Sequence, residues 1–514
     1  MKLKKLLPLI GLGAMTAVLL SACGGNSAKK DSAEAATSDE PITIMAPYIE
    51  TTPPADGNVV QKAIEKYTDT KIKMSWVPNT SYGDKTNIVM AGDAKDMPEV
   101  MVISKTAGFI KSAQAGAYWD LTDKLKDYPN LAKSDENIVE ASSVNGTVYG
   151  IYRGRDLVRS TAIIRKDWLE NLGLEEPKTV EDLYNVAKAF TEEDPDGNGQ
   201  NDTVGINIPK WPNLNNGGPY DLLATWLGAG NGWVEKDGKL IPSFETDEYM
   251  DSLKLMQKMV QEGLVNKDFA TLETDKWNDN FVSGKAGIIL DTYSRAASLR
   301  SLFNQQEEGS GNDKVLITGN LANNDGTTYS LPTDGYSSFL AIPKASVKTE
   351  ADLDRVLTFL DKLNDTEMLT LLNIGIEGEN FEYTDDTKQY YTLIDTPEAS
   401  AVTDATKSFA QISMGTTGEK LPKAQPATDG DKEFAEVRAT LEARDAKTAV
   451  FNPTASFITD TYTTKGAQLD QIIGDARTKY FAGQLDDAGW QAAVELWQSS
   501  GGNDLIEETN ALNK

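Results

Sequence analysis

The chain beyond position 41 alternates short apolar runs with amphipathic stretches, and this alternation limits the fold more than any other feature. Apolar runs occupy 42–48, 71–78 and 99–104, and they predict buried strands. The segment 59–67 carries apolar residues at helical spacing, and 82–92 is expected to form a second helix. Strand, helix, strand, helix and strand in this order predict a parallel sheet with right-handed crossovers, and therefore an α/β fold.

Later segments continue this pattern. Thr179 is a candidate N-cap at the start of a helix, and 245–265 and 350–365 are further amphipathic helices. Strands are expected at 284–294 and 335–346, and the C-terminal part is expected to be mostly helical. A chain of 514 residues is too long for one ordinary core, so two or more lobes are expected.

Composition excludes several classes of function. The formal net charge of −28 argues against nucleic acid or an anionic membrane surface as a partner. The chain contains no histidine, which excludes histidine-based catalytic triads and dyads and histidine metal sites. Its single cysteine excludes an internal disulfide bond and a thiolate metal cluster.

The N-terminus has the pattern of an export signal. Three lysines among the first five residues precede an apolar run over 6–20, which is shorter than the roughly 18 residues that span a bilayer. The run ends at Leu20-Ser21-Ala22-Cys23, which resembles the bacterial lipobox, where the cysteine carries a diacylglycerol lipid. The alternative is an ordinary secretory signal with a chance cysteine. The interpretation followed here is a lipoprotein signal peptide at 1–22, a flexible tether at 23–41, and a folded part anchored at the outer face of the cell membrane.

The segment 194–202 places side-chain oxygens at alternate positions around two glycines. Counted from its first residue, positions 1, 3, 5, 7 and 9 match those of an EF-hand calcium loop, with Gly199 at position 6 for the sharp turn. The candidate calcium ligands are Asp194, Asp196, Asn198, Gln200 and Asp202. Position 12 is Gly205, so the usual bidentate glutamate is missing. The alternatives are a structural calcium site and an Asx-rich turn without metal.

Several pieces of the chain, taken in order, carry a family resemblance. They are "MAGDAKDMPEVMV", "NGTVYGIY", "IIRKDWLENLGL", "DPDGNGQNDTVG", "FVSGKAGIIL", "GYSSFLAIPK", "GIEGENFEY" and "YFAGQLDDAGWQAAVELW". No single piece is decisive, but the ordered set resembles the extracellular solute-binding proteins of carbohydrate ABC importers. Within these, the chain is similar to large lipoproteins such as the alginate-oligosaccharide-binding proteins.

The resemblance implies a fold of two α/β lobes, the type II periplasmic-binding-protein fold, with an oligosaccharide held in a cleft between them. It implies an N-lobe of 42–150 plus 320–382 and a C-lobe of 151–319 plus 383–514. It also implies a monomeric binding protein, not an enzyme, that delivers sugar to the permease subunits of an ABC transporter. The chain has no G-x-x-x-x-G-K-[ST] loop, which agrees with ATP hydrolysis on another protein.

Candidate ligand-binding residues follow strand ends, where α/β folds place ligands. Aromatic rings are suited to stack on sugars, and the planar fork of Arg153 is suited to bridge two hydroxyls or to pair with an acidic sugar. The predicted set is Tyr48, Tyr82, Arg153, Trp211, Trp226, Asp291, Tyr293 and Tyr336.

Two other functions stay open at this level. A glycosidase needs only two suitably spaced carboxyl groups, and the chain has 78 acidic residues. A binding protein of the same fold could also hold peptides or other solutes, because a fold does not fix its ligand.

Overall fold

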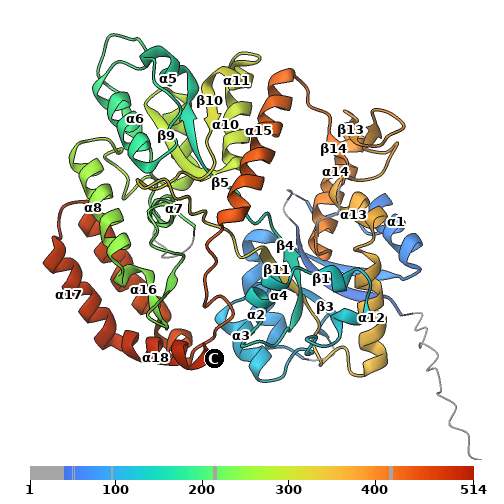
Figure 1. Cartoon of the computed structure of the whole chain (residues 1–514). Coiled ribbons are helices and arrows are strands. Elements are labelled where there is room, and N and C mark those ends of the chain that lie inside the picture. Colours follow the sequence, from blue (N-terminus) through green and yellow to red (C-terminus); the bar gives the residue numbers. More distant parts are fainter. Residues whose placement is uncertain are drawn as a thin grey trace, which may run out of the picture. The chain divides into compact units, whose positions relative to one another are not determined.

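A five-stranded sheet forms the centre of the first lobe (Figure 1). Its strand order is β2 (Ile72–Pro78), β1 (Ile42–Tyr48), β3 (Val100–Ile103), β11 (Tyr336–Ala341) and β4 (Gly150–Gly154). Strand β1 pairs in parallel with β2 and with β3, which confirms the parallel arrangement predicted for the first three strands. Strand β11 pairs antiparallel with both β3 and β4, so the complete sheet is mixed.

The computed structural model describes residues 40–48, 50, 52–93, 96–211, 217–415 and 421–513. The predicted signal peptide, Cys23 and the tether as far as residue 39 lie outside the described residues. Among the described helices, none combines the length and the apolar character needed to cross a membrane.

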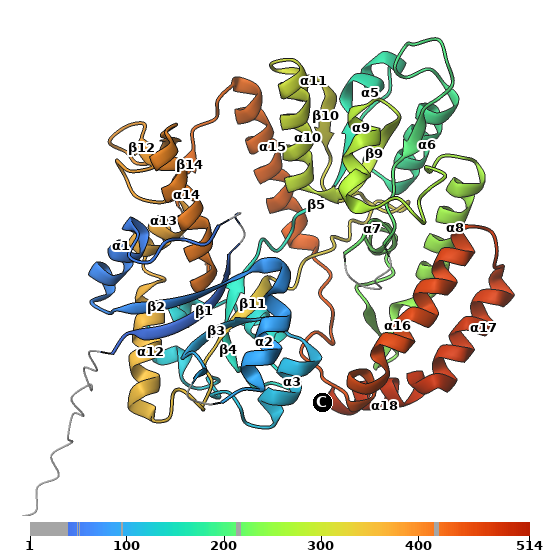
Figure 2. The same ribbon diagram turned by 180° about the vertical axis from the view of Figure 1, so that it is seen from behind.

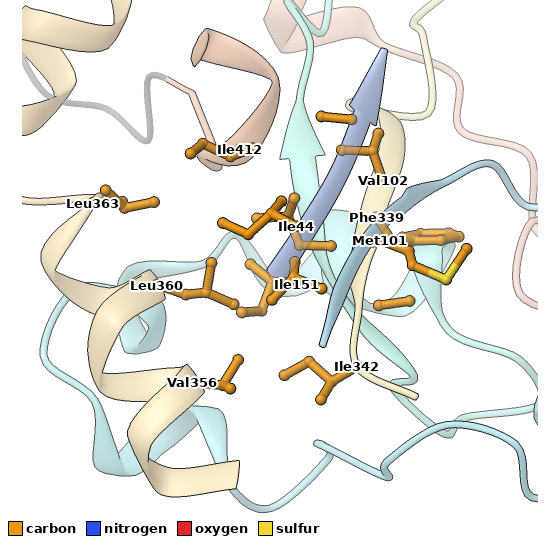
Figure 3. Close-up of a cluster of buried hydrophobic side chains, with 14 of the residues drawn as sticks. Ile44, Met101, Val102, Ile151, Phe339, Ile342, Val356, Leu360, Leu363 and Ile412 are labelled. Carbon is orange, nitrogen blue, oxygen red and sulfur yellow. The ribbon is translucent and has the colours of Figure 1, made fainter. Parts of the chain in front are cut away.

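Helices cover both faces of this sheet, as the two opposite views show (Figure 2). The helices of the first lobe are α1 (Val59–Thr68), α2 (Tyr82–Met90), α3 (Ala107–Gln114), α4 (Glu136–Ser142), α12 (Glu350–Lys362), α13 (Thr366–Asn373) and α14 (Pro397–Phe409). On one face, Val356 and Leu360 of α12 pack toward Ile44 and Ile151 of the sheet (Figure 3). On the other face, Phe339 stacks on Phe109 of α3 at 5.3 Å between ring centres.

The second lobe has its own four-stranded sheet and its own buried clusters. The sheet order is β10 (Val315–Ile317), β5 (Ser160–Arg165), β9 (Ala286–Thr292) and β6 (Val204–Ile206). The helices of this lobe are α5 (Lys166–Leu172), α6 (Val180–Glu192), α7 (Pro219–Trp226), α8 (Asp247–Gln261), α9 (Trp277–Val282), α10 (Tyr293–Gln306), α11 (Ser310–Lys314), α15 (Asp429–Asp445), α16 (Asp460–Phe481), α17 (Asp487–Trp497) and α18 (Asn503–Leu512).

The predicted start of α6 is confirmed. Thr179 caps the helix by accepting a hydrogen bond from the backbone N–H of Asp182, whose carboxylate in turn accepts from the backbone N–H of Thr179. A hairpin of β7 (Trp233–Lys236) and β8 (Lys239–Pro242) belongs to the same lobe. A separate small sheet contains the strands β12 (Phe381–Tyr383), β13 (Tyr390–Leu393) and β14 (Lys423–Ala424).

The chain changes lobe at positions that differ from the predicted ones. It leaves the first lobe after β4, close to the expected residue 150, and Leu331 still packs in the second lobe's core. The chain therefore returns to the first lobe just before β11, and not near residue 320 as predicted. The predicted departure near residue 383 is wrong, because α14 and Met414 pack in the first lobe's core and Phe409 lies edge-on against Trp76 at 5.1 Å. The first lobe thus extends to Met414.

The chain passes between the lobes three times, and a buried polar network in the second lobe joins the residues that flank these three passages. The carboxylate of Asp445 is fully buried and accepts hydrogen bonds from the backbone N–H of Asn320 at 2.7 Å and from its side-chain amide at 2.9 Å. The Asn320 amide also donates to the carbonyl of Ser160, and its oxygen accepts from the indole of Trp226 at 2.7 Å. Ser160 follows the first passage, Asn320 precedes the second, and Asp445 follows the third, so one network fixes all three.

Candidate functional site

Arg153 lies on the edge strand of the first lobe's sheet, where the chain is about to leave that lobe. Its neighbour across the ladder is Ser338 of β11, and its guanidinium Nη1 donates to the Ser338 hydroxyl at 2.8 Å. The Nε donor is buried and has no hydrogen-bond partner in the described structure. Burial, and then the positive charge of Arg155, lower the pKa of Arg153 to about 10. Its surroundings therefore penalise the charge and leave it without a counter-ion.

Two more arginines follow in the first passage between the lobes. Arg155 is exposed and Arg159 is half-buried, and the positive charge of Arg159 contributes to the lowered pKa of Arg155. Within the described part of the chain, no ion pair involves Arg153, Arg155 or Arg159. The adjacent Asp156 is itself paired with Arg438 of α15 at 3.3 Å.

Lys105 adds a fourth positive charge. Its ammonium donates to the carbonyls of Ala141 and Ala455, both at 2.8 Å. Burial lowers the pKa of Lys105 to about 8, against a smaller opposing effect of Asp334. The side chain of Asp334 is exposed, but partial desolvation raises its pKa against the attraction of Lys105 and Arg155. We call Lys105, Arg153, Arg155 and Arg159 the basic hinge cluster.

Two of the predicted aromatic residues lie beside this cluster. Tyr336 occupies β11 opposite Gly154, and its ring stacks on Phe339 at 5.2 Å. Tyr82 is close enough to Arg153 for their charges to interact. Tyr48, at the end of β1, is half-buried. The structure thus brings Arg153, Tyr82 and Tyr336 together in the first lobe.

A second group forms in the other lobe, around Trp211 and Asp291. Asp291 at the end of β9 pairs with Arg295, whose guanidinium lies 4.3 Å from the ring centre of Trp277. Trp277 in turn lies 6.2 Å from Trp211, ring centre to ring centre. Trp211 also borders a cavity of about 350 Å³. The other residues that line this cavity are Ile208, Pro209, Lys210, Gly218, Pro219, Tyr220, Asp221, Met256, Phe269, Ala270, Gly474, Asp475, Arg477, Thr478, Lys479 and Phe481.

Three of the predicted ligand residues are core residues. Trp226, at 0% exposure, ends α7, in which every residue except Asp221 is buried. Tyr293, also at 0%, begins α10 within a buried cluster, and the Arg438 guanidinium covers its ring at 5.5 Å. Tyr82, at 8%, donates its hydroxyl proton to the carbonyl of Met45 inside the first lobe. Their rings offer no open face to a sugar, which corrects the prediction for these three.

The oxygen-rich loop lies between α6 and β6 and is closed by its own hydrogen bonds. The Asp194 carboxylate accepts from the backbone N–H groups of Asn198 and Gly199. The Asn198 amide nitrogen donates to Asp196 at 2.9 Å and to Asp202 at 3.2 Å. No group of three or more acidic, histidine or cysteine side chains in the described ranges is placed to hold a metal.

The donor types in this loop nevertheless suit a hard cation such as calcium. A cation between Asp196 and Asp202 requires the Asn198 amide to rotate so that its oxygen replaces the nitrogen. Thr203 is buried and its hydroxyl donates to the carbonyl of Phe190, so that hydroxyl faces the core. Gln200 is exposed, and its contribution through the backbone carbonyl stays a prediction.

The sequence interpretation missed most of the basic hinge cluster. It selected Arg153 but not Arg155, Arg159 or Lys105. A signal was present, because "RGRDLVR" over 153–159 concentrates three arginines in a chain whose net charge is −28.

Residues 51–368 match the family described as bacterial extracellular solute-binding protein. The whole chain is 47% identical to Lipoprotein LipO of Bacillus subtilis (strain 168), with 97% of this chain and 96% of that protein covered. The chain belongs to the bacterial extracellular solute-binding protein family. Another relative in Bacillus subtilis, the polygalacturonan/rhamnogalacturonan-binding protein YtcQ, is 32% identical over 96% of this chain and 95% of its own.

Solved structures of this family share the fold. An extracellular solute-binding protein from Bifidobacterium longum subsp. infantis superposes with a TM-score of 0.70 at 20% identity, covering 92% of this chain and 98% of that one. The alginate-binding protein AlgQ2 superposes with a TM-score of 0.64 at 19% identity, covering 93% and 99%. The chain therefore has the two-lobe α/β fold, type II, that the sequence predicted.

Proposed function

We propose that this solute-binding protein binds an oligosaccharide between its two lobes and delivers it unchanged to the permease of an ABC importer. The observation that carries the proposal is the pair of separate α/β cores joined by passages at which polar and aromatic side chains collect. Support comes from the names of two relatives, YtcQ and the fructooligosaccharide ABC transporter substrate-binding protein FusA. FusA is 28% identical over 45% of this chain and 45% of its own. Closure of the lobes around the sugar is the step that the permease would recognise.

We place the protein outside the cell, held by a lipid on Cys23. The lipobox-like sequence and the similarity to a protein named lipoprotein support this placement. A structural calcium ion in the 194–202 loop belongs to the same proposal and is supported by the oxygen donors at alternate positions.

Binding without catalysis is also part of the proposal. Histidine is absent from the sequence and the sole cysteine is the proposed lipid site, so Ser–His and Cys–His catalytic pairs have no residues to use. A carboxylate pair remains chemically available, and the test therefore includes an assay for cleavage.

The test is calorimetric titration of the lipid-free protein with a panel of oligosaccharides and peptides. We expect a saturable response to at least one oligosaccharide, a fall in the radius of gyration in solution scattering at the same concentrations, and recovery of the intact sugar by chromatography. Cleavage of the bound sugar over time would move the protein to the glycosidases. A response to peptides and to no glycan would keep the fold and overturn the ligand.

A further inference from the structure

The basic hinge cluster is an unusual concentration of positive charge for this chain. The positive charge of Arg155 acts on Arg153 and that of Arg159 acts on Arg155, while Lys105 and Arg155 both interact with Asp334. The chain as a whole carries a net charge of −28. Two acids act on the cluster, fewer than its four positive charges. Asp156 interacts with Arg155 but is also paired with Arg438, and Asp334 interacts with both Lys105 and Arg155.

Holding like charges together costs stability, and so does a buried donor without a partner. Arg153 has both features, because its Nε is buried without an acceptor and the positive charge of Arg155 disfavours its charged form. Among the described residues, the acceptors of its guanidinium are neutral hydroxyls, those of Ser337 and Ser338. A carboxylate has the planar pair of acceptors that a guanidinium fork matches, and it supplies the missing charge.

We infer that the ligand is an acidic oligosaccharide whose sugar carboxylates are bound by the basic hinge cluster. This inference rests on the proposed function and names the class of sugar. The position of the cluster supports this inference, because Arg153 is the penultimate residue of β4 in the first lobe and Arg159 immediately precedes β5 of the second lobe. An anion bound there touches the segment that connects the lobes.

The experiment compares each acidic oligosaccharide with its neutral form. Galacturonate, glucuronate and mannuronate oligomers are titrated by calorimetry beside their methyl esters of the same length, which keep the hydroxyls and lose the charge. We expect at least one acid to bind at least tenfold more tightly than its ester. Arg155→Met should weaken that acid about tenfold and leave its ester unaffected.

The control variant is Lys267→Met, which removes one positive charge from an exposed position on the second lobe. It should leave the affinity for the acid unchanged. Equal losses in Arg155→Met and Lys267→Met would overturn the inference, because only the net charge would then matter. Binding of neutral sugars with no preference for any acid would overturn it while leaving the proposed function intact. Absence of binding by every glycan, acidic or neutral, would overturn both.

Discussion

Replacing Asp445 by alanine should be among the most damaging single changes at the junction of the lobes. The carboxylate is fully buried and is the acceptor for both N–H donors of Asn320, with a further hydrogen bond from Arg444 Nε at 2.6 Å. Arg444 is half-exposed and can turn to water, but the backbone N–H of Asn320 cannot. Asp445→Ala therefore leaves donors buried without an acceptor.

The magnitude follows from these bonds. A hydrogen bond to a charged group contributes about 1.5–3 kcal/mol, and each unsatisfied buried donor costs about 1–3 kcal/mol. The Asn320 amide keeps its contact with the carbonyl of Ser160, so one donor is fully orphaned and one is partly compensated. Part of this loss is offset, because the folded variant no longer has to bury and desolvate a carboxylate. Together these terms give a loss of about 3–5 kcal/mol, the range for breaking a buried charged pair.

The assay is unfolding in urea followed by tryptophan fluorescence. Glu436→Ala is the matched control, since it removes the same charge from an exposed position on the same helix, α15. Asp445→Asn, which keeps one acceptor, should fall between the control and Asp445→Ala. The reasoning is refuted if Asp445→Ala unfolds at the same urea concentration as Glu436→Ala.

Three further outcomes test the remaining proposals. Calcium at a hundred times its dissociation constant should stabilise the wild type by about 2.7 kcal/mol and raise its melting temperature; Asp196→Ala should abolish this response, and identical melting in calcium and in chelator would contradict the site. Cys23→Ala should release the protein from the membrane fraction or leave it unprocessed, so an unchanged fraction and mass would contradict lipidation. The amine of Lys105 should titrate near pH 8 by NMR of methylated lysines. Because the pKa of Lys105 is lower in the folded state, its charged form destabilises the folded protein. This destabilisation should disappear as pH rises from about 8 to 10.5, where the amine loses its proton. Titration of every lysine near pH 10.5 would contradict the burial of Lys105.

Local pattern predicted the elements of the fold well, because periodicity and caps are encoded over a few residues. The run 42–48 is strand β1 with the predicted bounds, and Thr179 caps α6 as expected. The boundary at 383 failed because it depends on contacts between distant segments. Contacts with distant residues, such as that between Phe409 and Trp76, reveal that α14 belongs to the first lobe, and the local sequence of α14 does not encode them.

The candidate site was less predictable for a similar reason. A position after a strand end does not reveal whether a ring points to solvent or into a core, and Trp226 and Tyr293 proved fully buried. The sequence identified Arg153 from its position after a strand, but only the structure shows that no acidic side chain among the described residues pairs with it. The charge run 153–159 was readable, and weighing it against the acidic composition would have recovered Arg155 and Arg159.

The position of β11 has a consequence for how the protein is made. β11 lies between β3 and β4, yet it is synthesised only at Tyr336, after most of the second lobe. A growing chain that has passed Gly154 therefore carries β4 without its partner strand and β3 with one open edge. Open edges pair readily with other chains, and such distant pairing slows folding. The lobe whose synthesis begins first therefore keeps an incomplete sheet while most of the second lobe is made, so the nascent chain needs protection from aggregation until Ala341 has emerged.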